Sequence, residues 1–152
     1  MSNECLITTL CGSTRHKQLI EMFAANLERS GHFIVFRSQF FAHADKITLT
    51  DEEIETANDL HRFKIRMSNA IHVVDPGGYL GESTKDEISY ALFNEKDIYI
   101  MSMAGGAYDT LLDIARKIPA KIRAKYKYHV DVTPGSVFPY AYCIGDNKPI
   151  FV

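Results

Sequence analysis

The residues between positions 75 and 87 form the densest group of side chains that could do chemistry. Three glycines and a tyrosine lie in this segment, directly after a predicted strand. A predicted helix follows, and Ile88 points into the core, so its neighbour Glu87 should lie at the edge of the buried face. Carboxylates gathered at the end of a strand are candidate nucleophiles and proton-transfer groups. Four are present: Asp75, Glu82, Asp86 and Glu87.

The same segment has a purely structural interpretation. Thr84 and Glu87 have the spacing of a capping box, in which both side chains bind free backbone N–H groups at a helix start. A glutamate in the first helical turn is also favoured by the helix dipole. A helix cap does not require the glycine-rich residues 77–81 before it, however. The residues alone therefore leave both interpretations open.

A second candidate loop runs from Cys11 to Arg15. Gly12 permits a tight turn and the close approach of a ligand. Two hydroxyl groups, the arginine and free helix N–H groups then converge, which suits a phosphate or another anion. The alternative is a turn and a helix cap supplied by Ser13 or Thr14. Cys11 lies near a helix N-terminus, where a thiolate would be stabilised, but no histidine partner is evident in the sequence.

The elements that must position these loops alternate along the chain. Segments that favour strands lie at 4–10, 32–37, 70–74 and 97–102, and helical spacing is found at 17–30 and near 84–94. Thr50 and Glu53 form a capping box at the start of another long helix. One apolar stripe runs along that helix: Ile54, Ala57, Leu60, Phe63 and Met67. A second apolar group marks a helix before Pro119: Leu111, Leu112, Ala115 and Ile118.

This order predicts a single α/β domain, a three-layer sandwich with a mostly parallel sheet of four or five strands in the flavodoxin or Rossmann style. Segments 128–132 and 136–144 are further candidate strands. In such sheets, ligands bind beyond the carboxyl ends of the strands. Both candidate loops follow predicted strands, so we expect them at that edge.

Composition limits the class of protein. The chain has 152 residues and a net charge of −2, which fits one domain and excludes an overall basic nucleic-acid binder. No apolar run reaches the length of a membrane span, and no secretory signal is evident. Three cysteines without paired spacing do not indicate a disulfide framework, so a reduced, cytoplasmic setting is expected.

Residues 77–91, GGYLGESTKDEISYA, resemble the signature segment of the nucleoside 2-deoxyribosyltransferase-like superfamily, which includes nucleoside 5′-monophosphate N-glycosidases. Residues 60–74 and the loop at 12–15 are similar to other parts of that family. The resemblance is closest to its branch of small, largely uncharacterised proteins. It covers about a third of the chain, and element order extends it to about residue 102.

The resemblance implies that Glu87, with Ala91 four residues later, is the nucleophile that attacks the anomeric carbon of a nucleoside and expels the base. Water or a second base would then resolve the ester, as in retaining glycosidases. Asp75 and Glu82 are the carboxylates available to protonate the base. Gly78, Tyr79 and Ser83 would shape the ribose pocket, and Gly12, Ser13 and Arg15 would hold phosphate or sugar.

Members that transfer deoxyribose usually carry an aspartate six residues before the nucleophile, where this chain has Gly81. This difference argues against transfer, and the spacing of Ser13 and Arg15 favours a 5′-phosphate, so a nucleoside 5′-monophosphate hydrolase is preferred to a transferase. The alternative is a non-catalytic nucleotide-binding or sensor module. The resemblance also implies a homodimer or higher homo-oligomer, because family members often complete the site from a neighbouring subunit. No nucleic acid, membrane or cofactor is expected.

Two further observations concern histidines. His61 and Lys64 lie one turn apart on the long helix, where they would face either the site or solvent. His43 and His72 show no metal spacing with a cysteine or a carboxylate, so no metal is expected.

Overall fold

The computed structural model describes residues 5–37, 42–76, 80–102, 113–114, 116–117, 119–123, 128–132 and 140–144. Strands and helices alternate along most of this length. No helix in the described ranges is both long and apolar enough to cross a membrane. In chain order the elements are β1 (Leu6–Cys11), η1 (Thr14–His16), α1 (Lys17–Arg29), β2 (Phe33–Phe36), α2 (Ala42–Asp45), α3 (Asp51–Met67), β3 (Ala70–Asp75), α4 (Glu82–Phe93), β4 (Asp97–Ser102), α6 (Ala120–Arg123), β5 (Tyr128–Val132) and β6 (Tyr140–Ile144).

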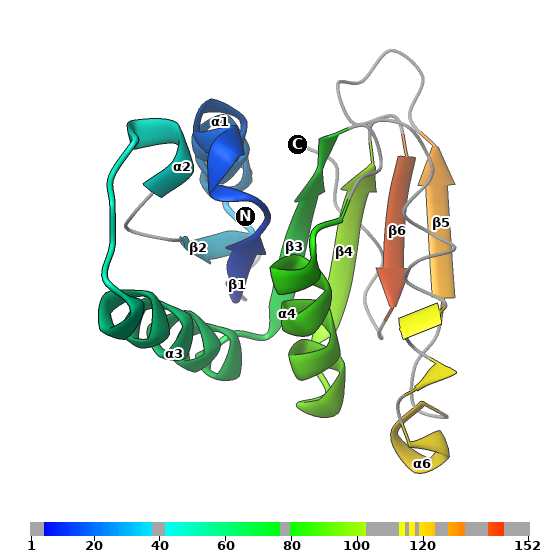
Figure 1. The fold of residues 1–152 in the computed structure, drawn as a ribbon. Coiled ribbons are helices and arrows are strands. Elements are labelled where there is room, and N and C mark those ends of the chain that lie inside the picture. The colour runs from blue at the N-terminus through cyan, green and yellow to red at the C-terminus, as the bar shows by residue number, and fades with distance from the viewer. Residues whose placement is uncertain are drawn as a thin grey trace.

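One six-stranded sheet has the order β2-β1-β3-β4-β6-β5. The first four strands in this order are parallel, and β6 runs antiparallel to both β4 and β5. The predicted α/β class and mostly parallel sheet are therefore confirmed, with six strands instead of four or five. Figure 1 shows the four right-hand strands side by side, with α4 in front of β3 and β4.

Two apolar clusters cover the two faces of this sheet, because successive strand residues point to opposite sides. On one face α1 packs through Ile20, Phe23 and Leu27 against Leu10 of β1 and residues of β2, β3 and β4. On the other face α3 and α4 pack over β1, β3 and β4. This cluster comprises Cys11, Ile65, Ile71, Val73, Leu80, Ile88, Ala91, Leu92, Ile98, Ile100 and Ile114. The three layers predicted from the sequence are thus formed.

Local sequence signals fix several element boundaries. The capping box is confirmed: the Glu53 backbone N–H donates to Thr50 Oγ1, and the Thr50 N–H donates to the Glu53 carboxylate, both at 3.1 Å. The bond from the Thr50 backbone is the main reason that the pKa of Glu53 is lowered. Gly31, at a φ of 75°, follows the end of α1, where a side chain would be strained. Ile88 is buried as predicted.

The apolar stripe predicted for the long helix does not face the core. Ile54, Leu60, Phe63 and Met67 are between 45% and 60% exposed, whereas His61 and Ile65 form the buried side of α3. Periodicity finds an apolar face but cannot say what covers it. Leu111, Leu112, Ala115 and Ile118, predicted for a later helix, lie outside the described residues.

A buried aromatic and polar group fills the α1 side of the sheet. The His72 ring stacks on Tyr99 at 4.6 Å and meets Phe33 edge-on at 4.8 Å. Its Nδ1 lies 2.7 Å from Thr8 Oγ1 on the neighbouring strand. Complete burial lowers the pKa of His72 to about 3, so the ring is neutral in the folded protein. His72 is thus a core residue.

The burial of His72 makes folding stability depend on pH. The unfolded chain binds a proton at His72 below its ordinary pKa of 6.5, whereas the folded chain does so only near 3. The neutral His72 ring therefore costs the folded protein no stability above pH 6.5. As pH falls from 6.5 toward 3, the free energy of unfolding decreases by about 1.4 kcal/mol per pH unit. Urea unfolding between pH 6.5 and about 5 should show this slope.

The His72→Gln variant should lose this component, whereas a His32→Gln variant, changed at an exposed histidine, should retain it. Equal pH slopes in wild type and His72→Gln would show that His72 does not titrate in this way.

Candidate active site

The strands that lead into the two candidate loops, β1 and β3, are neighbours where the strand order reverses. From β1 the chain passes through α1 to β2 on one side, and β3 and β4 lie on the other. Cys11, the last residue of β1, is in register with Val73 of β3. A Cβ atom on Gly12 would lie 2.9 Å from the Val74 carbonyl oxygen, so only glycine fits this close approach. Such a reversal of strand order is the usual ligand site of open α/β sheets.

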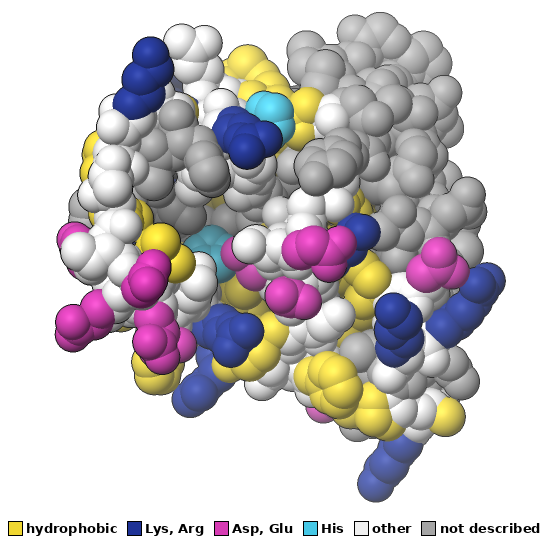
Figure 2. Space-filling view, viewed as in Figure 1, with side chains coloured by type: hydrophobic (Ala, Val, Ile, Leu, Met, Phe, Trp, Pro, Cys, Tyr) yellow, Lys and Arg dark blue, Asp and Glu magenta, His cyan; other side chains and the backbone are white. Residues whose placement is uncertain are grey.

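Three chemically reactive side chains converge beside this point. Cys11 Sγ lies 3.6 Å from His61 Nε2, and the same nitrogen lies 3.6 Å from Glu87 Oε2. The three side chains come from β1, α3 and α4, and their functional atoms all lie within 4.8 Å of one another. We call them the Cys11–His61–Glu87 cluster. In Figure 2 a histidine surface lies beside acidic side chains in the hollow between α3 and α4.

Hydrogen bonds at the C-terminal end of α3 set the position of His61. Ser68, the residue after the helix, pairs its hydroxyl with Thr9 Oγ1 at 2.7 Å and also donates to the Lys64 carbonyl oxygen at 2.7 Å. Asn69 binds Ile7 twice: its N–H donates to the Ile7 carbonyl, and its Oδ1 accepts from the Ile7 N–H. These bonds tie α3 to β1, which carries Cys11.

The cluster is dry on one side and open on the other. Cys11 and His61 are 1% and 8% exposed, whereas 22% of the Glu87 side chain is exposed. Glu87 Oε2 and His61 Nδ1 are buried atoms with no hydrogen-bond partner among the described residues. Since buried polar atoms are normally paired, these two atoms indicate a place for a ligand or water.

The Cys11 thiol is protonated at neutral pH. Burial is the main cause that raises its pKa well above 9.0, and the nearby Glu87 charge raises it further. The thiolate expected from a position near a helix N-terminus is therefore not favoured. Cys11 is instead a neutral thiol beside the Glu87 carboxylate.

The helix that carries Glu87 begins earlier than predicted. Gly81 is the N-cap of α4 without a side-chain bond, and Glu82 is the first helical residue. The Thr84–Glu87 capping box is therefore wrong, because Thr84 lies inside the first turn and is buried, and Glu87 lies in the second turn. The expectation of a first-turn Glu87 is wrong for the same reason. The structural interpretation of the motif thus loses its basis.

The other predicted site residues are found in different settings. Glu82 is 89% exposed and pairs with Lys85 Nζ at 3.3 Å, so the structure does not bring it to Glu87. Ser83 is also exposed. Asp75 is the last residue of β3, at the strand end that points to the site. Gly78 and Tyr79 lie outside the described residues.

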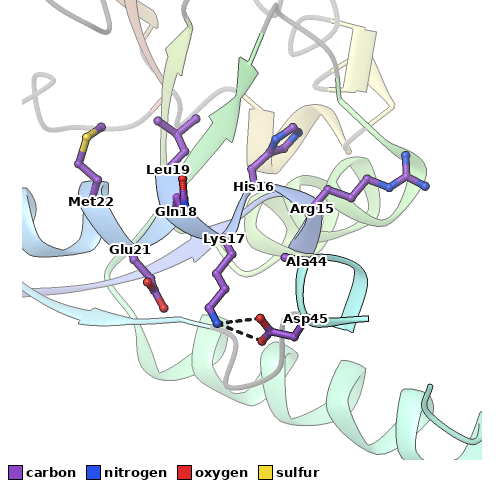
Figure 3. Close-up of a pocket in the computed structure, with 9 residues that line it drawn as sticks. All are labelled: Arg15, His16, Lys17, Gln18, Leu19, Glu21, Met22, Ala44 and Asp45. Atoms are coloured by element: carbon purple, nitrogen blue, oxygen red, sulfur yellow. Dashed lines mark hydrogen bonds and ion pairs between the residues drawn. The ribbon is translucent and has the colours of Figure 1, made fainter. Parts of the chain in front are cut away.

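The first loop supports the capping interpretation for Ser13. Its Oγ accepts a hydrogen bond from the Arg15 N–H at 3.3 Å at the start of η1. Arg15 is exposed and lines an open depression of about 910 Å³ with His16 and Lys17. In Figure 3, the Arg15 side chain points away from the ion pair between Lys17 Nζ and Asp45. None of the residues that line this depression belongs to the Cys11–His61–Glu87 cluster.

Sequence reasoning left the orientation of His61 open and missed its contact with Cys11. The structure separates His61 from Lys64, whose Nζ donates to the Arg37 carbonyl oxygen at 2.7 Å. Burial is the main cause that lowers the pKa of Lys64. Ile65, one turn after His61 on the same side of α3, is fully buried. Choosing Ile65 instead of the exposed stripe as the core face of α3 would have pointed His61 toward the site.

Comparison with models of known protein families finds no match, and comparison with curated proteins finds none. Any function must therefore be argued from the geometry of the site and from the resemblance of residues 77–91.

The contrast between the two described free cysteines is testable. Cys5 is exposed and Cys11 is buried. Because Cys11 is shielded and held as a thiol, iodoacetamide at neutral pH should alkylate Cys5 and leave Cys11 unmodified until urea is added. Peptide mass spectrometry resolves the two sites. Alkylation of Cys11 in the folded protein at the rate of Cys5 would contradict this description of the cluster.

Proposed function

We propose that this protein cleaves the N-glycosidic bond of a nucleoside or a nucleoside 5′-monophosphate, with Glu87 as the nucleophile. One observation carries the proposal. Glu87 Oε2 is a buried carboxylate oxygen without a hydrogen-bond partner among the described residues, next to the strand ends where α/β sheets bind ligands. A carboxylate oxygen without a hydrogen bond in such a place is suited to covalent attack. The resemblance of residues 77–91 supplies the substrate class.

The reaction would proceed in two steps. A Glu87 oxygen forms a bond to the anomeric carbon while the bond from that carbon to the base nitrogen breaks, and the departing base takes the electron pair and a proton. The resulting glycosyl ester is then attacked at the same carbon by water. That step returns Glu87 as a carboxylate and releases the sugar.

The neighbours of Glu87 have roles in this scheme. The Cys11 thiol lies beside the carboxylate, with its sulfur within 4.8 Å of a Glu87 oxygen. His61 Nε2 lies 3.6 Å from Glu87 Oε2 and is the described group best placed to take a proton from the attacking water. Cys11 and His61 are held by β1 and α3, so the nucleophile has little freedom to reorient.

Protonation of the departing base falls to Asp75 in this proposal. Glu82 was the other candidate, but it is exposed and paired with Lys85. Hydrolysis is preferred to transfer because Gly81, which stands where transferases usually carry an aspartate, serves as the N-cap of α4. The exposed Arg15 would recognise a 5′-phosphate.

The test is release of free base from a panel of ribonucleosides, deoxyribonucleosides and their 5′-monophosphates. Glu87→Gln should reduce release by about 1,000-fold or more, because the amide cannot form the ester. Glu82→Gln is the matched control, since it changes an exposed glutamate of the same helix, and should retain most activity.

Chromatography of the released base gives both the rate and the substrate. Equal rates for Glu87→Gln and wild type would remove Glu87 from the mechanism. Tight nucleotide binding by wild type without any base release would instead favour the nucleotide-binding or sensor module.

We also propose a homodimer that uses the exposed apolar face of α3. Leu60, Phe63 and Met67 form a stripe on that face, and solvent-exposed apolar patches commonly mark protein contacts. The resemblance of residues 77–91 implies that residues of the partner subunit complete the site.

The stripe predicts the outcome of one charged substitution. Phe63→Glu should shift the protein to a smaller species, because a carboxylate would be buried in the contact. Light scattering after size exclusion measures the mass. Met22→Glu on α1 is the control, as Met22 is also an exposed apolar residue on a different helix. A wild type that is monomeric at every concentration would contradict the homodimer.

A further inference from the structure

The Cys11–His61–Glu87 cluster has the donor set of a metal site. It offers one sulfur, one imidazole nitrogen and one carboxylate oxygen, all within 4.8 Å of one another. Zn²⁺ binds such atoms tetrahedrally at about 2.0–2.3 Å, which sets the distance between two ligands at about 3.3–3.6 Å. The two measured separations, Sγ to Nε2 and Nε2 to Oε2, are both 3.6 Å. Two of the three ligand pairs therefore have nearly the spacing that a bound ion would require.

We propose that this cluster binds one Zn²⁺ ion through Cys11 Sγ, His61 Nε2 and Glu87 Oε2, with the fourth position open. Thiolate and imidazole ligands favour Zn²⁺ over Mg²⁺ or Ca²⁺, which prefer oxygen ligands. The thiolate and carboxylate charges balance the charge of the ion. Glu87 is the most exposed of the three ligands, with 22% of its side chain accessible, so the ion would enter from its side.

Burial and rigid support make the arrangement favourable for binding. His61 is 92% buried, and its Nε2 lies near both other donors. Glu87 Oε2 is buried without a hydrogen bond among the described residues, so an ion would supply a missing partner. The three ligands come from three elements of the folded sheet and its helices, so no chain rearrangement is needed to gather them.

Binding exchanges a proton for the metal. The S–H bond of Cys11 breaks, the sulfur electron pair forms the Zn–S bond, and the proton passes to solvent. Affinity should therefore rise with pH. Bound zinc would also occupy the carboxylate that attacks the nucleoside, so, resting on the proposed function, Zn²⁺ should inhibit base release.

The test begins with the full-length protein freed of metal by a chelator. Titration with Co²⁺ should give a thiolate-to-cobalt charge-transfer band and the visible bands of tetrahedral cobalt, saturating at one equivalent. Addition of Zn²⁺ should abolish both. Cys11→Ser should lose the charge-transfer band, and His61→Gln should weaken binding by at least about 100-fold, because even changes outside the ligand set cost about 10–100-fold.

Two controls match these variants. Cys5→Ser and His32→Gln change an exposed cysteine and an exposed histidine and should bind as wild type does. Thermal unfolding guards against a folding defect: Zn²⁺ should raise the Tm of wild type and both controls, but not of Cys11→Ser or His61→Gln. Absence of the cobalt bands in wild type, or unchanged binding in both ligand variants, would overturn the proposal.

The two proposals can fail separately. Wild type that gives the cobalt bands but releases no base from any substrate in the presence of a chelator would reject the proposed function and keep the zinc site. Base release that Zn²⁺ does not inhibit, in a wild type without cobalt bands, would reject the zinc site alone.

Discussion

The site depends on the hydrogen bonds that fasten the end of α3 to β1. Thr9 and Ser68 pair their hydroxyls in a buried setting, and Asn69 binds the Ile7 backbone on both sides. Each buried bond contributes about 1 kcal/mol, and leaving a partner unsatisfied costs more. These bonds fix the height and rotation of α3 over the sheet. His61, two turns earlier, is thereby held over the sulfur at the end of β1.

Apolar packing of α4 positions Glu87, the third member of the Cys11–His61–Glu87 cluster. Ile88, Ala91 and Leu92 seat α4 on the sheet, so Glu87 stands at the rim of the buried face. The Glu87 side chain is therefore mostly buried, with 22% of it exposed. That setting gives it a dry neighbour, Cys11, and an open side for a ligand. The same carboxylate serves as nucleophile in the proposed reaction and as ligand in the proposed zinc site.

Much of the fold could be predicted from the sequence because its signals are local. Strand segments, the Thr50–Glu53 capping box and the turn at Gly31 depend on residues close in the chain, and all were found. Gly12 was expected to make room for a ligand, whereas the group that lies close to it in the structure is the Val74 carbonyl of β3. The edge of the sheet that carries the candidate loops follows from strand order alone.

The errors arose where packing decides between local possibilities. The apolar stripe of α3 faces outward, because the hydrogen bond between Ser68, after the end of α3, and Thr9 of β1 fixes the rotation of the helix. In that rotation His61 and Ile65 face the sheet. Gly81 caps α4 although Thr84 had the better capping sequence, since the Thr84 side chain is buried. The contact of Cys11 with His61 joins residues from two separate elements, and no local spacing encodes it.

The most direct test of the central claim is to trap the covalent intermediate on Glu87. A nucleoside with fluorine at the sugar 2′ position slows both steps, and a good leaving base restores the first, so the glycosyl ester should accumulate. Mass spectrometry of the digested protein should then find the added sugar on the peptide that contains Glu87. Base release from the natural substrate, with the sugar adduct on another residue or with no adduct at all, would contradict the assignment of Glu87 as the nucleophile.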